Sequence, residues 1–233
     1  MSGFFVREES ARRYHARMNY EQILLEQSEA FALQLGERIE RMPERSDSHR
    51  ALATIFACEL CIEHAYGLRI LFATGAQNAA CAMLQVQFDA MVRAAWYAYA
   101  AADGEFDAML DVNSPLKLPT TGRMVHDLKE CLANEPGLAG LVKPLLAIND
   151  AFTEALGDFE HGGMNPLLRT GTGFPTDLFD TVVRSSNGVM YLAFRLLARQ
   201  GPPSDFIQSI DGALAGFEEA LPMTCFADPA SAG

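Results

Sequence analysis

The sequence predicts an all-α protein, a single helical bundle of about seven or eight helices with a long buried central helix. Three observations predict this class. No stretch alternates apolar and polar residues as a half-buried strand does. Apolar residues instead recur at helical spacing in several long segments, which glycine- and proline-rich turns separate. The segment 76–102 is apolar nearly all round, which is typical of a helix at the centre of a bundle.

Composition limits the classes of protein that need to be considered. The chain has 233 residues, 49% hydrophobic and 21% charged, which suits one domain over residues 1–233 with an ample core. Its net charge of -12 disfavours non-specific nucleic-acid binding, which depends on phosphate neutralisation by Lys and Arg. The five cysteines follow no regular spacing, so we expect reduced, buried thiols in a cytoplasmic protein. The apolar run at the N-terminus is too short for a signal peptide.

The first half of the chain predicts three long helices. Residues 1–18, rich in Arg and Glu, form a polar helix or arm, and a helix over 20–42 follows that Pro43 ends. The next two helices are separated near Gly75. Residues 70–88 carry no charge and approach membrane-spanning length. Gly75 and the amide side chains in this stretch nevertheless indicate a boundary between helices. We therefore expect no membrane association.

Helix caps and breaks define the remaining elements. We expect Ser46 or Asp47 to cap the second of the long helices, Thr176 to cap a helix that runs to Gln200, and Ser204 to cap the last one. Before these last two helices, we expect a loop with one helical turn over 105–120, a short helix over 122–133 and a turn at Asn134. A helix over 138–160 follows, in which Pro144 makes a kink or marks the first turn. The last helix runs from Ser204 to about Leu221, and a frayed tail covers 222–233.

Asp89 and Arg93 are the two charges on the central segment 76–102, one helical turn apart. Because a buried charge is costly unless it is paired, the simplest interpretation is an ion pair within the helix. The alternative is that Asp89 orients the Arg93 guanidinium toward a ligand or an anionic intermediate. The sequence leaves both interpretations open.

Two other predicted core helices also carry polar groups, Glu63-His64 and Asp158-x-x-His161. His161 precedes two glycines at a helix end, where the helix dipole favours the protonated imidazole. It is a candidate acid or base, or else a histidine that bonds the last carbonyls of its helix. Cys58-x-x-Cys61-x-x-His64 does not predict a zinc site, because positions i and i+6 of a helix are about 120° apart.

Three segments, 63–75, 87–96 (QFDAMVRAAW) and 158–163 (DFEHGG), together resemble an uncharacterised family of bacterial helical proteins. That family carries Q-F-E-A-x-x-R-A-x-W and H-G-G motifs, and Arg169 matches an arginine that follows them. The resemblance covers most of residues 55–170. The chain departs from it with Asp89 for Glu, Asp158 for Ser and Glu160 for Thr, which makes the matching centre more acidic.

The family is distantly similar to HEPN-type helical domains, many of which are RNases or partners in toxin–antitoxin and phage-defence systems. The HEPN signature, an arginine followed after four to six residues by a histidine, is not found in this sequence. The resemblance therefore implies the helical fold more strongly than it implies nuclease activity.

Two functions follow from these residues, while a third, a metal-binding bundle, needs ligands of which Asp158-x-x-His161 supplies only half. In the first, the chain is an enzyme or a binding protein for RNA or a small molecule, without metal or cofactor. Its catalytic residues are Arg93 and His161, and its ligand-binding residues are Glu63, His64, Asp89 and Arg169. In the second, the chain is a non-enzymatic interaction or structural protein, a homodimer, in which the same polar residues form a buried network that fixes how the helices pack.

Overall fold

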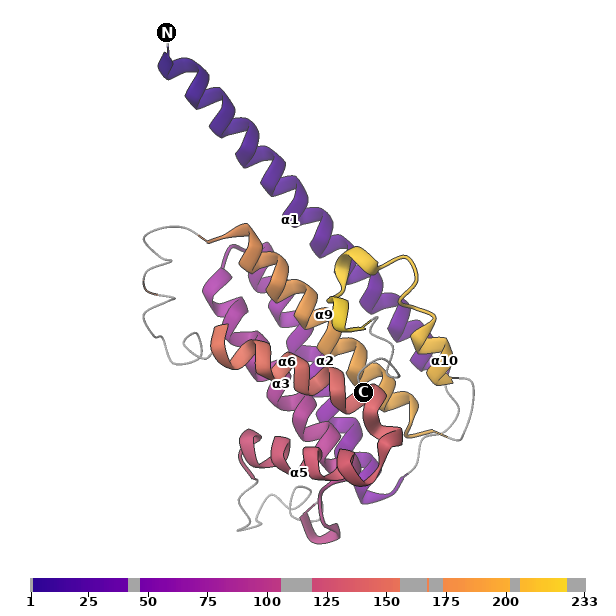
Figure 1. Ribbon diagram of the computed structural model, residues 1–233. Helices are drawn as coiled ribbons and strands as arrows, with labels where there is room; N and C mark the ends of the chain where they lie inside the picture. The colour runs from indigo at the N-terminus through magenta and orange to yellow at the C-terminus, as the bar shows by residue number, and fades with distance from the viewer. Residues whose placement is uncertain are drawn as a thin grey trace.

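The structure, a computed structural model, describes residues 2–41, 47–105, 119–155, 167, 174–201 and 206–225. These residues contain seven α-helices, three short 3-10 helices and no strand, which confirms the predicted all-α bundle (Figure 1). The α-helices are α1 (Ser2–Glu40), α2 (His49–Ala73), α3 (Gln77–Tyr99), α5 (Thr121–Asn134), α6 (Ala139–Ala155), α9 (Thr176–Ala198) and α10 (Phe206–Asp211). The 3-10 helices are η1 (Pro136–Leu138), η2 (Glu218–Ala220) and η3 (Met223–Cys225).

Helix α1 is continuous over 39 residues, where the sequence suggested a polar arm followed by a second helix. Leu24, Phe31 and Leu35 of its second half are buried in the core. The first half extends away from the other helices (Figure 1). The helix ends at Glu40, shortly before Pro43, as expected because proline cannot continue the hydrogen-bond ladder.

Helices α2 and α3 form an antiparallel hairpin at the boundary that the sequence predicts. Gly75 follows α2 with a φ of 80°, a left-handed conformation that costs glycine little, and α3 begins two residues later. At the other end of α2, the Ser48 hydroxyl accepts a hydrogen bond from the amide of Ala51. Ser48 is therefore the cap, and the expectation of Ser46 or Asp47 is wrong.

Helix α3 is buried along most of its length, as predicted, and it shares the centre of the bundle with α9. Helix α9 contacts α1, α2, α3, α6 and α10, and nearly every residue from Val182 to Ala198 is buried. The sequence did not single it out because polar residues such as Ser186, Asn187 and Arg195 interrupt its apolar pattern. Its N-cap position is Pro175, without a side-chain bond, so the predicted cap at Thr176 is wrong.

Pro144 lies inside α6, past the first turn. Proline has no amide hydrogen, so the carbonyl four residues earlier, that of Gly140, loses its helical partner. Arg195 of α9 supplies the missing donor, with Nη1 2.5 Å from the Gly140 oxygen. The interior proline is thus accommodated by a contact between helices.

The C-terminal region contains less helix than the sequence predicts. Helix α10 ends at Asp211, and turns follow in which Gly216 adopts a φ of 90°. The expectation of one helix to Leu221 is therefore wrong. The segment that follows packs on α9 at Gly188, so residues up to Cys225 are not a frayed tail, while residues 226–233 lie outside the described part.

Among the described residues, α2 is the helix long and apolar enough to cross a membrane, judged by length and composition. Half of its apolar window is buried inside the bundle, and the core helix of a folded domain passes the same test, so this is weak support for a span. Its outward face nevertheless exposes four large apolar side chains, Phe56, Leu60, Tyr66 and Ile70, by 40–63%.

Candidate functional site

Arg93 lies on a partly exposed face of α3 without a partner among the described residues. No ion pair joins it to Asp89, one turn away, and its Nε is shielded from solvent without a hydrogen bond. The described group on which its charge acts is the Tyr97 hydroxyl, whose pKa burial raises and Arg93 lowers to a smaller extent. The intrahelical pair, the simplest interpretation of the sequence, is therefore not formed.

The polar neighbours of Arg93 on this face bond to other groups. Gln85 Nε2 donates to Asp89 Oδ1 at 3.2 Å. Trp96, one turn beyond Arg93, donates from its indole to Asp127 of α5 at 3.0 Å, and Arg123 Nε donates to the same carboxylate at 2.7 Å. The bond from Trp96 to Asp127 ties α3 to α5, while Arg93 Nε is buried without a hydrogen bond.

Glu63 and His64 lie on α2, and the structure brings neither into contact with Asp89 or Arg93. Glu63 is exposed and His64 is partly exposed. Burial lowers the pKa of His64 and the Glu63 carboxylate raises it to a smaller extent, so the imidazole is mostly neutral near pH 7. Neighbouring Cys58 and Cys61 are fully buried, and the described residues contain no disulfide between them.

His161 and Arg169, together with Asp158, lie outside the described residues. Their distance from Arg93 therefore stays a prediction of the sequence. Within the described part of the chain, no group of three or more His, Cys, Asp or Glu side chains is placed to hold a metal ion.

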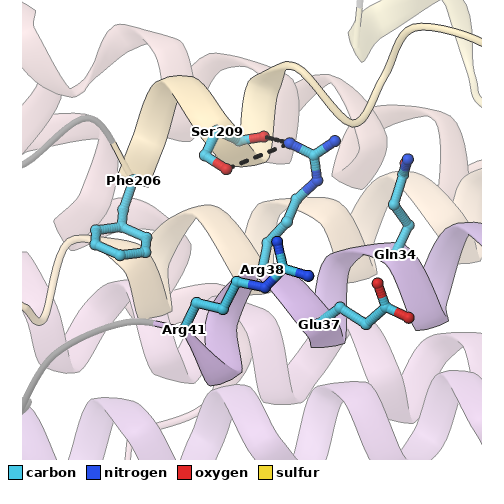
Figure 2. Close-up of a pocket in the computed structure, with 6 residues that line it drawn as sticks. All are labelled: Gln34, Glu37, Arg38, Arg41, Phe206 and Ser209. Carbon is cyan, nitrogen blue, oxygen red and sulfur yellow. Dashed lines mark hydrogen bonds between the residues drawn. The ribbon is translucent and has the colours of Figure 1, made fainter.

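A pocket of about 270 Å³ lies between the end of α1 and α10, a place that the sequence analysis did not consider. Six residues line it: Gln34, Glu37, Arg38, Arg41, Phe206 and Ser209 (Figure 2). Arg38 Nη1 donates to the backbone carbonyl of Ser209 and to its hydroxyl at 3.3 Å, which fastens α1 to α10. The spacing of the α1 residues marks one polar helix face, but no sequence signal brings α10 to it.

The described residues form a buried polar network that the sequence did not predict. Gln87 of α3 and Ser186 of α9 exchange two hydrogen bonds, from Gln87 Nε2 to the Ser186 carbonyl at 2.9 Å and from the Ser186 hydroxyl to Gln87 Oε1 at 2.7 Å. Asn187 donates to the Ser28 hydroxyl and to the Ala220 carbonyl, both at 2.8 Å. These groups fix the packing of α1, α3 and η2 on α9.

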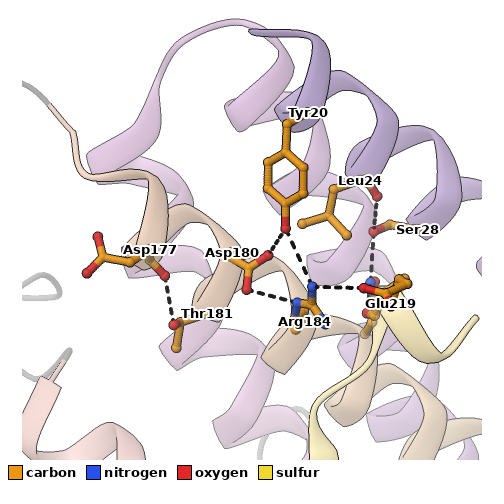
Figure 3. A network of polar contacts seen from close by, with 10 residues as sticks. Tyr20, Leu24, Ser28, Asp177, Asp180, Thr181, Arg184 and Glu219 are labelled. Carbon is orange, nitrogen blue, oxygen red and sulfur yellow. Dashed lines mark hydrogen bonds and ion pairs between the residues drawn. The ribbon is translucent and has the colours of Figure 1, made fainter. Parts of the chain in front are cut away.

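A second polar cluster fastens α1 to the outer side of α9 (Figure 3). The Tyr20 hydroxyl donates to Asp180. Arg184 Nε lies 2.9 Å from Oδ2 of the same carboxylate, and Arg184 Nη2 lies 3.8 Å from Glu219 Oε2. Burial, reinforced by Asp180, raises the pKa of Tyr20. Every charged group in this cluster has a partner within it, so we assign the cluster a role in stability.

Comparison with known proteins identifies a family but no function. No curated protein matches the chain, and no solved structure does. The sequence model of one family matches residues 58–223, from the middle of α2 to the start of η3. That stretch contains Arg93 and α10, whereas α1 lies outside it. The chain belongs to DUF6988, a family of unknown function.

Proposed function

We propose that this protein binds a small anionic ligand through the guanidinium of Arg93. A guanidinium presents a planar fork of N–H donors that matches a phosphate or a carboxylate. Arg93 is partly exposed, so a ligand from solvent can reach it, and it is not neutralised by Asp89. The observation that carries the proposal is the buried Nε without a hydrogen-bond partner.

The energetics of a buried, unpaired donor favour a ligand over a structural role for Arg93. A buried donor without a partner destabilises the fold by about 1–3 kcal/mol. An arginine retained for stability would be expected to pair with the carboxylate one turn away, as Arg184 does with Asp180 on α9 at 2.9 Å. Without a ligand, the unpaired Nε of Arg93 instead destabilises the fold, and a bound anion would remove that free-energy cost.

The resemblance suggests what could complete the site. His161 and Arg169, if they lie beside Arg93, would add a second cation and a group that transfers protons near neutral pH. With a phosphodiester as ligand, His161 would serve as general acid or base and Arg93 would stabilise the developing negative charge. Glu63 and His64, which lie on α2, are not required by this proposal.

Isothermal titration with sodium phosphate, adenosine monophosphate and a short single-stranded RNA tests anion binding. We expect saturable binding of at least one of these probes, weakened about tenfold or more by Arg93→Gln. Lys129→Gln on the exposed face of α5 removes the same charge elsewhere and should leave the affinity unchanged. Failure of all three probes to bind, or equal affinity in Arg93→Gln, would overturn the proposal.

Incubation with total RNA tests the catalytic extension separately. Cleavage that disappears in both Arg93→Gln and His161→Ala supports a nuclease that uses these two side chains. Cleavage that survives in either variant contradicts the assigned roles. Anion binding without any cleavage leaves the protein as a binding module and removes the nuclease interpretation.

A second candidate function is self-association, which the outward face of α2 favours. Phe56, Leu60 and Ile70 are 43–63% exposed there, and the exposed carboxylates Glu59 and Glu63 lie among them. The first 18 residues of the chain carry four arginines against two glutamates, in a protein with a net charge of -12. We infer that the extended first half of α1 in a second copy covers this acidic and apolar face (Figure 1).

Sedimentation velocity over a range of concentrations tests this inference. The full chain should form dimers that Phe56→Ser combined with Ile70→Ser dissociates, as does removal of residues 2–18. Leu33→Ser, at an exposed apolar position of α1, is the matched control and should keep the dimer. A monomeric full chain would contradict the inference, and binding of the α2 face to phospholipid vesicles would assign that face to a membrane surface instead.

A further inference from the structure

The pocket between α1 and α10 holds charged groups that the fold does not use. Glu37 and Arg41 are one turn apart on α1, a spacing at which opposite charges commonly pair. No ion pair between them is present in the described structure, and both are exposed. In Figure 2 the Arg41 side chain runs from the end of α1 toward Glu37 and Arg38. A carboxylate and a guanidinium thus line one pocket without pairing with each other.

Gln34 and Arg38 add an acceptor and further donors to the pocket. Gln34 Oε1 is shielded from solvent and has no hydrogen-bond partner. Arg38 uses Nη1 for its two bonds to Ser209, which leaves Nε and Nη2 without a partner in the described part of the chain. A ligand that donates to Gln34 and accepts from the arginines would satisfy these groups.

Phe206 supplies the apolar end of the pocket. It is partly exposed at the first position of α10, and its ring lies at the opposite end of the pocket from Gln34 in Figure 2. An aromatic ring of a ligand can pack against it in an offset or edge-to-face arrangement. A volume of about 270 Å³ admits a small molecule of about one ring and a short polar chain.

We propose that this pocket binds a small zwitterion with an aromatic ring, which is the chemistry of an aromatic α-amino acid. The ligand carboxylate pairs with Arg41 and with the remaining N–H groups of Arg38. The ligand ammonium donates to Gln34 Oε1 and pairs with Glu37. The ligand ring packs on Phe206.

Charge selects this class over a dianion such as a phosphate ester. The two arginines and Glu37 give the pocket a net charge of about +1, and Glu37 would repel a second negative charge. This site is distinct from Arg93, which lies on α3, a helix that packs against α2, α5, α6 and α9 instead of α10. It also lies mainly on α1, outside the residues that the family shares.

Titration calorimetry with L-phenylalanine as the probe tests the proposal on the full chain. Three analogues each lack one feature: phenethylamine lacks the carboxylate, 3-phenylpropionate lacks the ammonium, and L-alanine lacks the ring. We expect L-phenylalanine to bind and each analogue to bind about tenfold more weakly or worse. Equal affinity for an analogue would show that the contact to the missing group does not contribute to binding. If neither L-phenylalanine nor L-tryptophan bound, the proposal would be overturned.

Variants assign the binding to this pocket. Arg41→Gln, Glu37→Gln and Phe206→Ala change side chains that are exposed or partly exposed, so the fold should survive, which circular dichroism checks. Each should weaken L-phenylalanine binding, whereas Arg123→Gln on α5 and Arg93→Gln should not. Loss of binding in Arg93→Gln, or its persistence in both Arg41→Gln and Glu37→Gln, would place the ligand elsewhere and contradict the assignment. Adenosine monophosphate that binds here more tightly than L-phenylalanine would also overturn it.

Discussion

The Arg195 side chain satisfies a carbonyl that a proline leaves open. Its Nη1 binds the Gly140 oxygen exposed by Pro144, its Nε lies 2.7 Å from Asp211 Oδ1, and Tyr191 donates to the same carboxylate oxygen at 2.7 Å. One guanidinium therefore links α6, α9 and α10. Because each group has a partner, its removal leaves a buried carbonyl and a carboxylate that both lose a bond.

Arg195→Met is expected to lower the free energy of unfolding by about 2 kcal/mol, a value reduced because Asp211 is 38% exposed. In a Pro144→Ala background the loss should be smaller by about 1 kcal/mol, since the amide of residue 144 can then bind Gly140. Urea unfolding of the four proteins in this cycle measures the coupling. Additive losses would mean that Arg195 does not compensate for the proline.

Arg69 gives the opposite case, a more deeply buried arginine that no carboxylate of the described residues bonds, although Glu29 acts on it from a distance. Its guanidinium lies 4.5 Å from the centre of the Tyr66 ring and 3.9 Å from Met190 Sδ, while Nη2 is buried without a partner. Burial lowers its pKa. Arg69→Met should therefore leave stability unchanged or raise it by about 1 kcal/mol. A loss as large as that of Arg195→Met would show that the ring contact compensates for the buried charge.

Asp127 makes the contact between α3 and α5 dependent on pH. Burial raises the pKa of this carboxyl, whereas the hydrogen bonds from Arg123 and Trp96 lower it. Together the lowering effects are larger, so the pKa lies below its ordinary value of 3.8. The stabilisation is therefore complete above that value and is lost as the pH falls through the folded pKa.

The difference in unfolding free energy between the wild type and Asp127→Asn should be largest near neutral pH and shrink below about pH 4. Fluorescence of Trp96, the single tryptophan of the chain, reports on this contact directly. Urea titrations at a series of pH values measure the difference. A difference that stays constant from pH 7 to below pH 4 would contradict the assignment.

At the scale of elements, the segment after α10 packs on α9 through Pro222 and Cys225, and we call residues 212–225 the strap. A methyl group added at Gly188 would come 2.7 Å from Pro222 Cγ and 3.4 Å from Cys225 Sγ. The proline ring cannot move aside as a flexible side chain would. The absence of a side chain at position 188 thus lets η3 approach α9, and burial there raises the pKa of the Cys225 thiol to about 12.

Gly188→Ala should destabilise the protein by about 1–3 kcal/mol through this overpacking. Gly36→Ala is the matched control, because Gly36 also lies inside a helix but has nothing within 4 Å of the added methyl. It should stabilise the protein by about 0.5–1 kcal/mol. Thermal unfolding of both variants gives the comparison, and a stabilising Gly188→Ala would show that the strap is not packed there.

Some elements could be predicted because their signals are local. Helical spacing and Gly75 identify the α2–α3 hairpin within a few residues of its observed ends. The end of α10 could not be predicted, because Gly212 and Gly216 sit within an otherwise helical pattern and packing on α9 decides the conformation. The buried network of Gln87 and Ser186 was missed for the same reason, since both bonds join residues far apart in the sequence.

At the scale of the whole molecule, α3 and α9 are the central helices, and the helices that carry the proposed sites pack on them. The sequence identified Arg93 because a charge stands out in an apolar helix. It could not show that Asp89 bonds to Gln85 instead, because the choice between these partners depends on side-chain packing. Likewise, Arg41 and Phe206 meet only because α10 folds back onto the end of α1.

The central claim is that the Arg93 guanidinium is held for a ligand and not for the fold. The unfolding free energy of Arg93→Met, measured against the wild type by urea titration without added anions, tests it most directly. We predict that the variant is as stable as the wild type or more stable by about 1 kcal/mol, because an unsatisfied donor is removed. A loss of about 2 kcal/mol or more would contradict the claim, since it would mean that Arg93 has a structural partner.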